Sequence, residues 1–424
     1  MIDTVADRSA CPDCGAGTVS LPGALSWCAD CEWNLDAYQV DRRAPEFGWR
    51  WVDRWTHRLA YRATRRQFAR LVGRPPAATG AGVTRVVTGA ASLVLLAGVF
   101  ALAGTGIWLI VAFRFPNPSI VLGVALLGLA VALRPRFGRL DEDLEVLDRA
   151  RAPELFRLVD EVAAAVGAPV PDVVGVDGDL NAYAGRVGLR RRAVLCLGLP
   201  YWGSLTPPER VALLGHELGH FVNGDPRRAL LTQPAFTTLG SAANLVRPVD
   251  TVSGAGIFEL LGAALARAFQ WTLSRLLFAV HVALVCVALR DIQRAEYLAD
   301  EMSARAAGTA AATSLLDATV AVDSIALAVR REARAGHGPQ RWRAAVTEAR
   351  VAAADRLPRR RQLSVREETS LFASHPPSGL RHRMLASRPA YEPAVVLDEE
   401  RSARIDAELA REYERVRRNI SWSG

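Results

Sequence analysis

The stretch His216-Glu217-Leu218-Gly219-His220 decides the fold class of this chain, because it repeats histidine at the period of an α-helix. Residues four apart lie one turn from each other on one helix face, so both imidazole rings can reach a single metal ion. Glu217 lies beside them, where its carboxylate can take a proton from a water molecule that the ion activates. The chain holds seven histidines, so this spacing seldom arises by chance. It predicts a catalytic zinc site with Glu217 as general base. The alternative is two surface histidines on an ordinary helix.

The segments before this stretch predict a mainly α-helical protein with a small β-sheet. Thr206-Pro207-Pro208-Glu209 has the pattern of a capping box with proline in the first turn, so the helix that carries the histidines begins there. Residues 153–166 have the period of an amphipathic helix. Short runs rich in β-branched residues predict strands at residues 172–176, 181–187 and 193–197.

A third protein ligand is expected from Arg294-Ala295-Glu296-Tyr297-Leu298-Ala299-Asp300, far downstream. Zinc in a catalytic site takes three protein ligands and keeps one position for water. Glu296 and Asp300 are four residues apart, so both can point from one helix toward the metal. We expect Glu296 to bind the zinc and Asp300 to orient a histidine ligand from behind. On its own, such a pair is more often a solvated stripe on a helix surface.

Two Cys-x-x-Cys pairs near the N-terminus predict a second metal site. Cys11 and Cys14 precede Cys28 and Cys31 at a spacing that suits four thiolates around a structural zinc ion. So short a segment cannot bury its own core, so we expect residues 1–35 to fold as a zinc ribbon only with the metal bound. Disulfides or redox-active thiols are the alternatives. No apolar run of a signal peptide precedes the cysteines, so we expect a cytosolic N-terminus with reduced thiols.

Two charge-free segments predict a transmembrane hairpin over residues 86–133. Residues 86–113 could form a helix about 40 Å long, enough to cross a bilayer with some tilt. Residues 119–133 form a shorter apolar run after a proline-rich turn. A pair of buried core helices is the alternative.

Arginines flank this hairpin on both outer sides. Eleven of them lie between residues 41 and 85, among several aromatic residues, and Arg134, Arg136 and Arg139 follow the second apolar run. Residues 36–85 are therefore expected to form a basic juxtamembrane segment against anionic lipid, with a solvated basic helix as the alternative. The positive-inside rule places the N-terminus and the region after the hairpin in the cytoplasm.

Residues 229–289 are expected to form an apolar, membrane-associated insertion in the catalytic domain. Residues 229–246 carry no charge, and residues 271–289 carry only Arg275 and His281. Side chains that share one metal lie on one side of a membrane, so the number of spans between the two halves of the site is even. A second hairpin and amphipathic helices packed on the catalytic domain both satisfy this condition, which leaves two or four spans in total.

The composition suits apolar blocks joined to polar domains in a chain of 424 residues. Half of the residues are hydrophobic although 23% are charged, and the net charge is +8. All 52 basic residues are arginine, which we attribute to genome composition. No nucleic-acid-binding module is recognisable, so we expect no nucleic acid partner. The sequence also lacks a G-x-x-x-x-G-K loop, so we expect no ATPase motor of that type.

Four motifs, in the same order, resemble the HtpX-type and CAAX-prenyl-endopeptidase family of integral-membrane zinc metallopeptidases. They are Asn181-Ala182-Tyr183-Ala184-Gly185, His216 to His220 with Asp225, Glu296 to Asp300, and Ser374-His375-Pro376-Pro377 with Arg381. The N-terminal cysteines are not part of this pattern. The resemblance implies a gluzincin with a zincin-like α+β catalytic domain at residues 140–390. Its zinc ligands would be His216, His220 and Glu296, and Asp225 and Asp300 would support them from behind.

The same resemblance implies roles for residues around the zinc. An edge strand near Asn181 and Tyr183 would bind the backbone of the substrate, and Arg381 would also lie at the substrate. His375 would lie near the scissile carbonyl, where it could donate a hydrogen bond to the oxyanion. Because two prolines follow it, His375 could instead be a structural turn residue.

The sequence thus predicts a multi-pass, membrane-anchored zinc metalloendopeptidase at the cytoplasmic face of the cell membrane. Its substrates would be membrane or misfolded proteins and peptides. Prenyl-protein processing would use the same chemistry, and a vestigial peptidase whose zinc ribbon binds a protein partner is a further alternative. Residues 336–370 are expected to form a mobile loop near the site, and residues 391–424 a charged C-terminal helix and tail.

Overall fold

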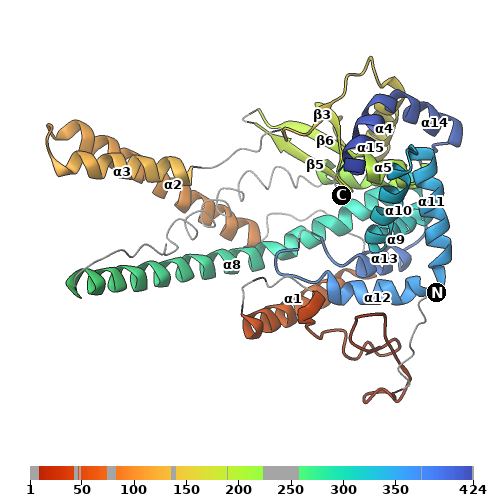
Figure 1. The fold of residues 1–424 in the computed structure, drawn as a ribbon, viewed down its shortest axis with the longest axis horizontal. Helices are drawn as coiled ribbons and strands as arrows, with labels where there is room; N and C mark the ends of the chain where they lie inside the picture. The colour runs from red at the N-terminus through yellow and green to blue at the C-terminus, as the bar shows by residue number, and fades with distance from the viewer. Residues whose placement is uncertain are drawn as a thin grey trace. The chain divides into compact units, whose positions relative to one another are not determined.

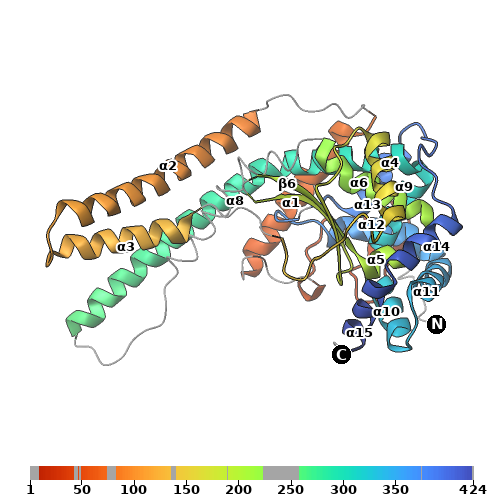
Figure 2. The same cartoon turned by 90° about the horizontal axis from the view of Figure 1, so that it is seen from above.

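The chain divides into two compact units. The computed structural model describes residues 9–42, 46, 49–73, 83–134, 140–188, 190–222, 257–373 and 375–422. The first unit contains Met1–Ala78, Arg139–Asp225 and Ile292–Gly424, and the second contains Thr79–Gly138 and Pro226–Asp291. The long helix α8 (Ile257–Ala307) therefore contributes residues to both units. Figures 1 and 2 show the elements of each unit from two directions.

A four-stranded sheet belongs to the first unit, with the strand order β3-β4-β6-β5. β4 (Val173–Asp177) and β6 (Arg192–Gly198) are parallel neighbours in the middle. β3 (Glu145–Val146) and β5 (Ala182–Val187) pair antiparallel on the outer sides. The three strands expected from the sequence are confirmed within one residue at either end. β5 is an edge strand, and such a strand can pair with another extended chain.

Three helices cover this sheet and lead to the histidines. α4 (Pro153–Val166) and α6 (Pro207–Val222) share one hydrophobic core with the strands, and the short α5 (Leu199–Ser204) connects β6 to α6. One half of the expected capping box is present, because the backbone N–H of Thr206 donates to Oε2 of Glu209 at 3.0 Å. The start of the helix that carries the histidines is therefore fixed by a buried side chain.

Two glycines allow α6 to cross the C-terminal part of α8 at close range. A Cβ atom on Gly215 would lie 2.8 Å from Cβ of Ala306, and one on Gly219 would lie 3.1 Å from Cα of Ala299. Ordinary carbon contacts need about 3.5–4.0 Å, so larger residues would force the helices apart. Each glycine directly precedes one of the two histidines of α6, so the same crossing brings the imidazole rings against α8.

Helices complete the first unit on its C-terminal side. Their bounds are α9 (Thr309–Val320), α10 (Val322–Arg334), α11 (Pro339–Ala352), η2 (Ala354–Arg356), α12 (Leu357–Glu367), α13 (Ser378–Ala386), α14 (Glu399–Glu408) and α15 (Ala410–Trp422). The expectation of a mobile loop at residues 336–370 is wrong, because α11, η2 and α12 occupy most of that range. The C-terminal segment forms two helices rather than one, and it buries Ile405 and Tyr413 in the main core.

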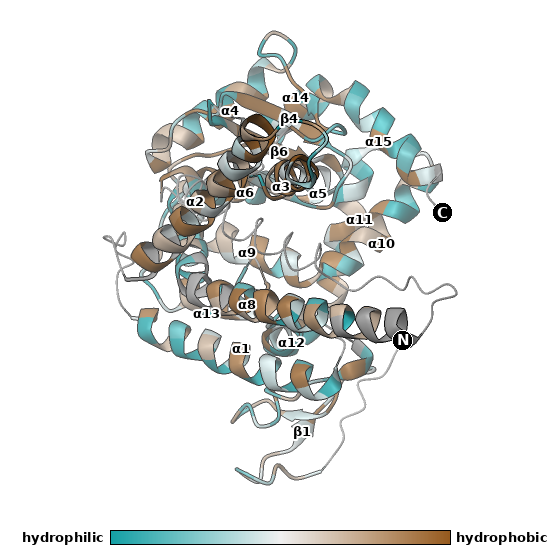
Figure 3. Cartoon of the chain, turned by 90° about the vertical axis from the view of Figure 1, so that its left-hand side faces the viewer, coloured by the Kyte–Doolittle hydropathy of each residue, from teal (hydrophilic) through white to brown (hydrophobic). Residues whose placement is uncertain are grey.

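The N-terminal part of the first unit is a small cysteine-bearing hairpin followed by one long helix. β1 (Thr18–Val19) pairs antiparallel with β2 (Trp27–Cys28), and a 3₁₀ turn, η1 (Val40–Arg42), leads to α1 (Arg50–Leu71). Figures 1 and 3 both show this hairpin beside α12. Residues 11–35, which include this hairpin, are called the ribbon below.

The second unit contains a helical hairpin of strongly apolar composition. α2 (Val83–Ala112) packs along α3 (Pro118–Leu133), and Figure 3 shows both helices in the hydrophobic colour. A Cβ atom on Gly106 would lie 2.8 Å from the carbonyl oxygen of Gly123, so the two backbones approach closely there. Small residues at such crossings are typical of helices that pack within membranes.

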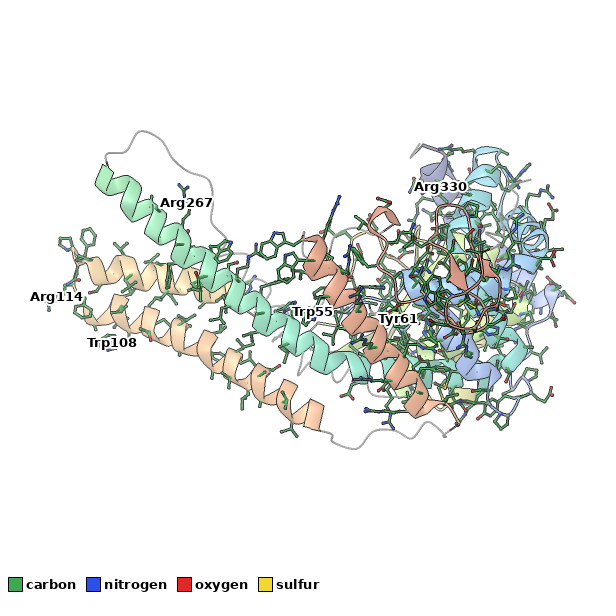
Figure 4. All side chains as sticks on the ribbon, turned by 90° about the horizontal axis from the view of Figure 1, so that it is seen from below. Trp55, Tyr61, Trp108, Arg114, Arg267 and Arg330 are labelled. Atoms are coloured by element: carbon green, nitrogen blue, oxygen red, sulfur yellow. The ribbon has the colours of Figure 1, made fainter. Side chains whose placement is uncertain are left out.

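One helix of the described residues is long and apolar enough to cross a bilayer by itself. This segment is Gly89–Ala112, with a mean hydropathy of 2.3 and 6% of its window buried. α3 is apolar but has only 16 residues. Figure 4 labels Trp108 and Arg114 near the turn of the hairpin. The expected apolar segment at residues 229–246 lies outside the described residues, and the one at residues 271–289 lies within α8.

Candidate active site

Side chains from two helices of the first unit meet at one point. His216 and His220 lie on α6, with their ring centroids 4.9 Å apart and the ring planes at 85°. Glu296 comes from α8, and its Oε2 lies 3.5 Å from Nε2 of His216. Its Oε1 lies 3.6 Å from Nε2 of His220. Candidate ligand atoms of all three residues lie within 4.8 Å of one another. The structure therefore brings together the three ligands that the sequence suggests.

These separations suit a tetrahedral zinc ion. Zinc bonds of about 2.0–2.2 Å to nitrogen and oxygen place neighbouring ligand atoms about 3.3–3.6 Å apart. The two nitrogen-to-oxygen distances of 3.5 and 3.6 Å fall in this range. Two imidazole nitrogens and one carboxylate oxygen are also a donor set of catalytic zinc sites, which keep a fourth position open. The three residues thus fit zinc in both geometry and chemistry.

A buried ion pair between Asp300 and Arg381 contacts His216. Oδ1 of Asp300 lies 3.1 Å from Nδ1 of His216. Arg381, on α13, donates to the two carboxylate oxygens of Asp300 at 2.9 and 2.6 Å. Arg381 is 6% exposed, so its guanidinium is held by Asp300 and by the core. This geometry gives Arg381 a positioning contact to Asp300, and the substrate contact expected from the sequence stays a prediction.

The charges of this cluster favour a bound cation. Burial raises the pKa of Glu296, but the nearby His220, His216 and His375 outweigh burial and hold that pKa well below its usual value. Burial raises the pKa of Asp300 too, but Arg381 outweighs it and the net shift is downward. Burial and Arg381 lower the pKa of His216, but hydrogen bonds to Asp300 and Glu296 raise it to about 9. Two anionic carboxylates therefore attract positive charge at this point.

A cleft of about 390 Å³ opens beside the three candidate ligands. Glu217 lies on its wall next to His216 and is 5% exposed. The cleft is lined by residues at the start of the edge strand, on α6 and α9, on the loop before α13 and on α13 itself, namely Leu180, Asn181, Ala182, Leu213, His216, Glu217, Leu315, Leu316, Thr319, His375, Pro376 and Arg381 among others. The carboxylate expected to act as a base therefore borders the space in which a substrate would lie.

The strand β5 forms one side of this cleft. Asn181 precedes the strand and lines the cleft, whereas Tyr183 is on the strand and 37% exposed. The carbonyl of Asn181 accepts from the backbone N–H of Gly198 on β6. Since hydrogen-bonding direction alternates along an antiparallel strand, the backbone groups of Ala182 and Ala184 turn away from β6. The edge expected from the sequence is thus beside the candidate metal site.

His375 lies on the turn between α12 and α13, at the mouth of the same cleft. Its Nδ1 is 2.5 Å from Oε2 of Glu296. The side chain is 51% exposed, so it remains within reach of a molecule that enters the cleft. The structure therefore places His375 next to a candidate ligand. Asp225 and Ser374, which the sequence also singled out, lie outside the described residues.

The cleft contains two ionisable residues that the sequence analysis missed. Oε2 of Glu368 accepts from the backbone N–H of Ser378 at 2.6 Å, and burial raises the pKa of this carboxyl group. The hydroxyl of Tyr201 lies 3.3 Å from Oγ1 of Thr319, and burial raises the pKa of Tyr201 to about 12. Neither residue belongs to a motif with recognisable spacing, so only the fold brings them to the site.

The four N-terminal cysteines form a second candidate metal site. Their Sγ atoms are 3.6 Å apart for Cys11 and Cys31, and 3.5 Å apart for Cys14 and Cys28. Zinc–sulfur bonds of about 2.3 Å imply a separation of about 3.8 Å at tetrahedral angles. All four are free thiols here. The group suits a structural zinc better than disulfides.

The fold and the two-helix site define a zinc metalloprotease. Residues 149–388 match the peptidase family M48, and the chain belongs to this family. It is also similar to a protein named "Protease HtpX homolog" from Syntrophobacter fumaroxidans (strain DSM 10017 / MPOB). The two are 29% identical over 256 residues, which cover 57% of this chain and 78% of that protein. No solved structure matches this chain. The resemblance expected from the sequence is thus confirmed.

Proposed function

We propose that this protein is a membrane-anchored zinc metalloendopeptidase that hydrolyses membrane or misfolded proteins at the cytoplasmic face. The observation that carries the proposal is the convergence of His216, His220 and Glu296 on one point, beside a cleft that Glu217 borders. The edge strand β5 forms another wall of that cleft. Metal ligands, a base and a backbone-binding edge are the parts that peptide hydrolysis requires.

Each residue around the metal site has a separate role in the proposed reaction. Zinc, when bound, supplies a Lewis acid that polarises a carbonyl and acidifies water. Glu217 takes the proton of the attacking water and passes it to the leaving amine. Asp300, held by Arg381, keeps Nδ1 of His216 protonated and leaves Nε2 free to bind the metal.

His375 is placed to stabilise negative charge on the reacting carbonyl. Its side chain is half-exposed at the cleft and already bonds a carboxylate oxygen of Glu296. A donor aimed at a developing oxyanion contributes about 3–4 kcal/mol to the transition state in other hydrolases. His375 therefore serves as the second donor to the oxyanion, beside the metal.

Recognition of the substrate is expected to depend on its backbone. An extended peptide that adds to β5 would use the outward groups of Ala182 and Ala184. Strand addition reads main-chain hydrogen bonds, so many sequences would bind, provided that the peptide is unfolded. This property suits a protease of misfolded or membrane proteins.

The second unit supplies the membrane anchor. α2 contains the segment of membrane-spanning length, and α3 packs against it through the close approach of Gly106 and Gly123. A helix of 16 residues is about 24 Å long, so α3 reaches most of the way across a bilayer core of about 30 Å. We infer a hairpin with both ends in the cytoplasm. The further spans expected between residues 229 and 289 stay a prediction.

The exposed face of α1 is suited to lipid headgroups and supports this placement. It is formed by Arg50, Trp51, Arg54, Trp55, Arg58, Leu59, Arg62, Arg66, Ala69 and Arg70. The one acidic residue of the helix, Asp53, is buried. Trp51 and Trp55 are 72% and 61% exposed, and Figure 4 labels Trp55 on this helix. Arginine and tryptophan on one face are typical of helices that lie on anionic membranes.

The general base provides the most direct functional test. Glu217→Gln in the full-length protein should retain zinc at both sites but lower the cleavage of an unfolded, fluorescein-labelled protein by at least 100-fold. Glu400→Gln, on an exposed side chain of α14, is the matched control and should cleave normally. Normal cleavage by the zinc-loaded Glu217→Gln protein would remove Glu217 from its assigned role.

A further inference from the structure

The ribbon is docked on the peptidase domain through specific polar contacts. The indole N–H of Trp27 donates to Oε1 of Gln362 on α12 at 3.0 Å, and Nε2 of Gln362 donates to the carbonyl of Ala29 at 2.7 Å. Trp27 is fully buried, and it packs with Leu35 and with Leu363 of α12. These contacts join residues more than 300 positions apart in the sequence. The docked face of the ribbon is therefore an internal interface of the first unit.

Arg366 makes a further link between the ribbon and α12. Its guanidinium donates to the carbonyl of Leu25 at 2.8 Å and to the carbonyl of Asn34 at 2.8 Å. It also lies over the ring of Trp27, 5.5 Å from the centroid. The whole side chain is 2% exposed. Arginine buried in this way, with its charge shared between two carbonyls of a folded ribbon, is stable only while the ribbon keeps its shape.

A second link runs from the ribbon to α13. Glu32 binds Arg383 of α13 at 2.6 Å and Arg65 of α1 at 2.6 Å. Glu32 directly follows the last cysteine of the ribbon, Cys31. The position of its carboxylate thus depends on the loop that the four thiolates hold.

Both helices that receive the ribbon are tightly coupled to each other. A Cβ atom on Gly379 would lie 1.9 Å from the carbonyl oxygen of Arg361, so α12 and α13 cross in direct backbone contact. The backbone N–H of Gly379 donates to Oγ of Ser364 at 2.9 Å. Glu368, at the end of α12, accepts from the backbone N–H of Ser378 at 2.6 Å. A displacement of α12 would therefore move the start of α13.

This helix pair carries two groups of the candidate active site. The turn between α12 and α13 holds His375, which contacts Glu296. One turn into α13 lies Arg381, which holds Asp300 behind His216. The contacts above therefore connect Arg366, through α12 and α13, to the candidate ligands His216 and Glu296.

We propose that the ribbon is an internal brace whose metal-dependent fold positions His375 and Arg381, with Arg366, Gln362 and Glu32 as positioning residues. The inference rests on the proposed function, because it assigns the ribbon to the same catalytic site. A segment of this size folds only around its metal, so zinc on the four cysteines sets the shape of the carbonyl groups that Arg366 grips. Loss of that zinc would therefore weaken the catalytic site from a distance.

Variants at the interface test this brace in the full-length protein. Arg366→Ala should raise amide hydrogen exchange in residues 368–381 and weaken zinc binding at the His216 site by about tenfold, the range found when partners of zinc ligands are removed. It should lower kcat more than it raises KM, because the edge strand that binds substrate lies elsewhere. Gln362→Ala is a milder variant for the same measurements if Arg366→Ala does not fold. Cys14→Ser should reproduce these effects through loss of the ribbon metal.

Arg404→Ala is the matched control, because Arg404 pairs with Glu400 on the surface of α14. This variant should leave amide exchange, zinc affinity and the kinetic constants unchanged. Exchange in residues 368–381 and catalytic-zinc affinity are measured without substrate, so they decide the inference even if the wild-type protein cleaves nothing. Such inactivity would count against the proposed function alone. If Arg366→Ala or Gln362→Ala matches the wild-type protein in exchange and zinc affinity, the brace does not exist.

Discussion

Oδ1 of Asp300 lies 3.1 Å from Nδ1 of His216, in a buried pair that contacts the ring nitrogen opposite the one proposed to bind the metal. The carboxylate holds one ring nitrogen and so determines which nitrogen faces the metal. Because Asp300 and Glu296 lie one turn apart on α8, the same helix provides both a candidate ligand and the residue that holds another candidate ligand.

Asp300→Asn should weaken catalytic zinc binding by about 10–100-fold. The amide keeps the size of the side chain but loses the charge that Arg381 and His216 both contact. Zinc affinity can be measured by competition with a chromophoric chelator, with zinc on the cysteines as an internal reference. Unchanged affinity at the histidine site would show that Asp300 does not orient His216.

Glu209 links stability to pH at the start of α6. Burial raises its pKa, but Arg350, Ser314 and the backbone N–H of Thr206 outweigh burial and lower it. A lowered folded-state pKa means that the carboxylate stabilises the fold above its ordinary pKa of about 4.5. That stabilisation is lost as the pH falls through the lower folded-state pKa.

Glu209→Gln should therefore destabilise the protein at pH 7 by about 1–3 kcal/mol, the cost of breaking charged, buried hydrogen bonds. The difference from the wild type should shrink as the pH falls below about 4.5. Thermal unfolding in detergent across this pH range measures both effects. A difference that stays constant with pH would mean that the charge of Glu209 does not matter.

Backbone recognition at β5 predicts sensitivity to missing amide hydrogens in the substrate. Peptides N-methylated at alternate positions should lose about 5–10-fold in kcat/KM for each hydrogen bond removed, at about 1 kcal/mol per bond. Methylation at the intervening positions, whose N–H groups point away from the strand, is the control. Equal rates for both series would indicate that the substrate does not pair with β5.

The arginine face of α1 predicts a contact that depends on lipid charge. In nanodiscs of full-length protein, residues 50–66 should be more protected from amide exchange with anionic lipid than with zwitterionic lipid. Changing Arg54, Arg58 and Arg62 together to Gln should abolish the difference. Arg330→Gln, at an exposed position of α10 that Figure 4 labels, should not. Equal protection in both lipids would leave α1 as a solvated basic helix.

Much of the catalytic centre could be predicted from the sequence because its constraints are local. Histidines four residues apart share a helix face whatever the rest of the fold does, and the pair of Glu296 and Asp300 follows the same rule. The capping residues before α6 and the proline at the start of α4 fixed those helices for the same reason. The crossing of α6 and α8 at Gly215 and Gly219 joins residues far apart in the sequence, so no local pattern predicts it. Glu296 becomes a candidate ligand only because the chain also contains the H-E-x-x-H motif.

The failures have long-range causes. The arginine-rich composition of residues 336–370 favours a mobile loop near the site, but three of these arginines bind distant partners. Arg350 pairs with Glu209, Arg361 with Asp317, and Arg366 with carbonyls of the ribbon. No local pattern reveals such partners. The docked position of the ribbon and the cleft residue Glu368 were invisible for the same reason.

A zinc-edge anomalous difference map from a crystal of the full-length protein tests the central claim most directly. The account predicts a peak bound by Nε2 of His216, Nε2 of His220 and a carboxylate oxygen of Glu296, at about 2.0–2.2 Å from each. A map with zinc only among the four cysteines, or with the Glu296 carboxylate turned away from the metal, would contradict it.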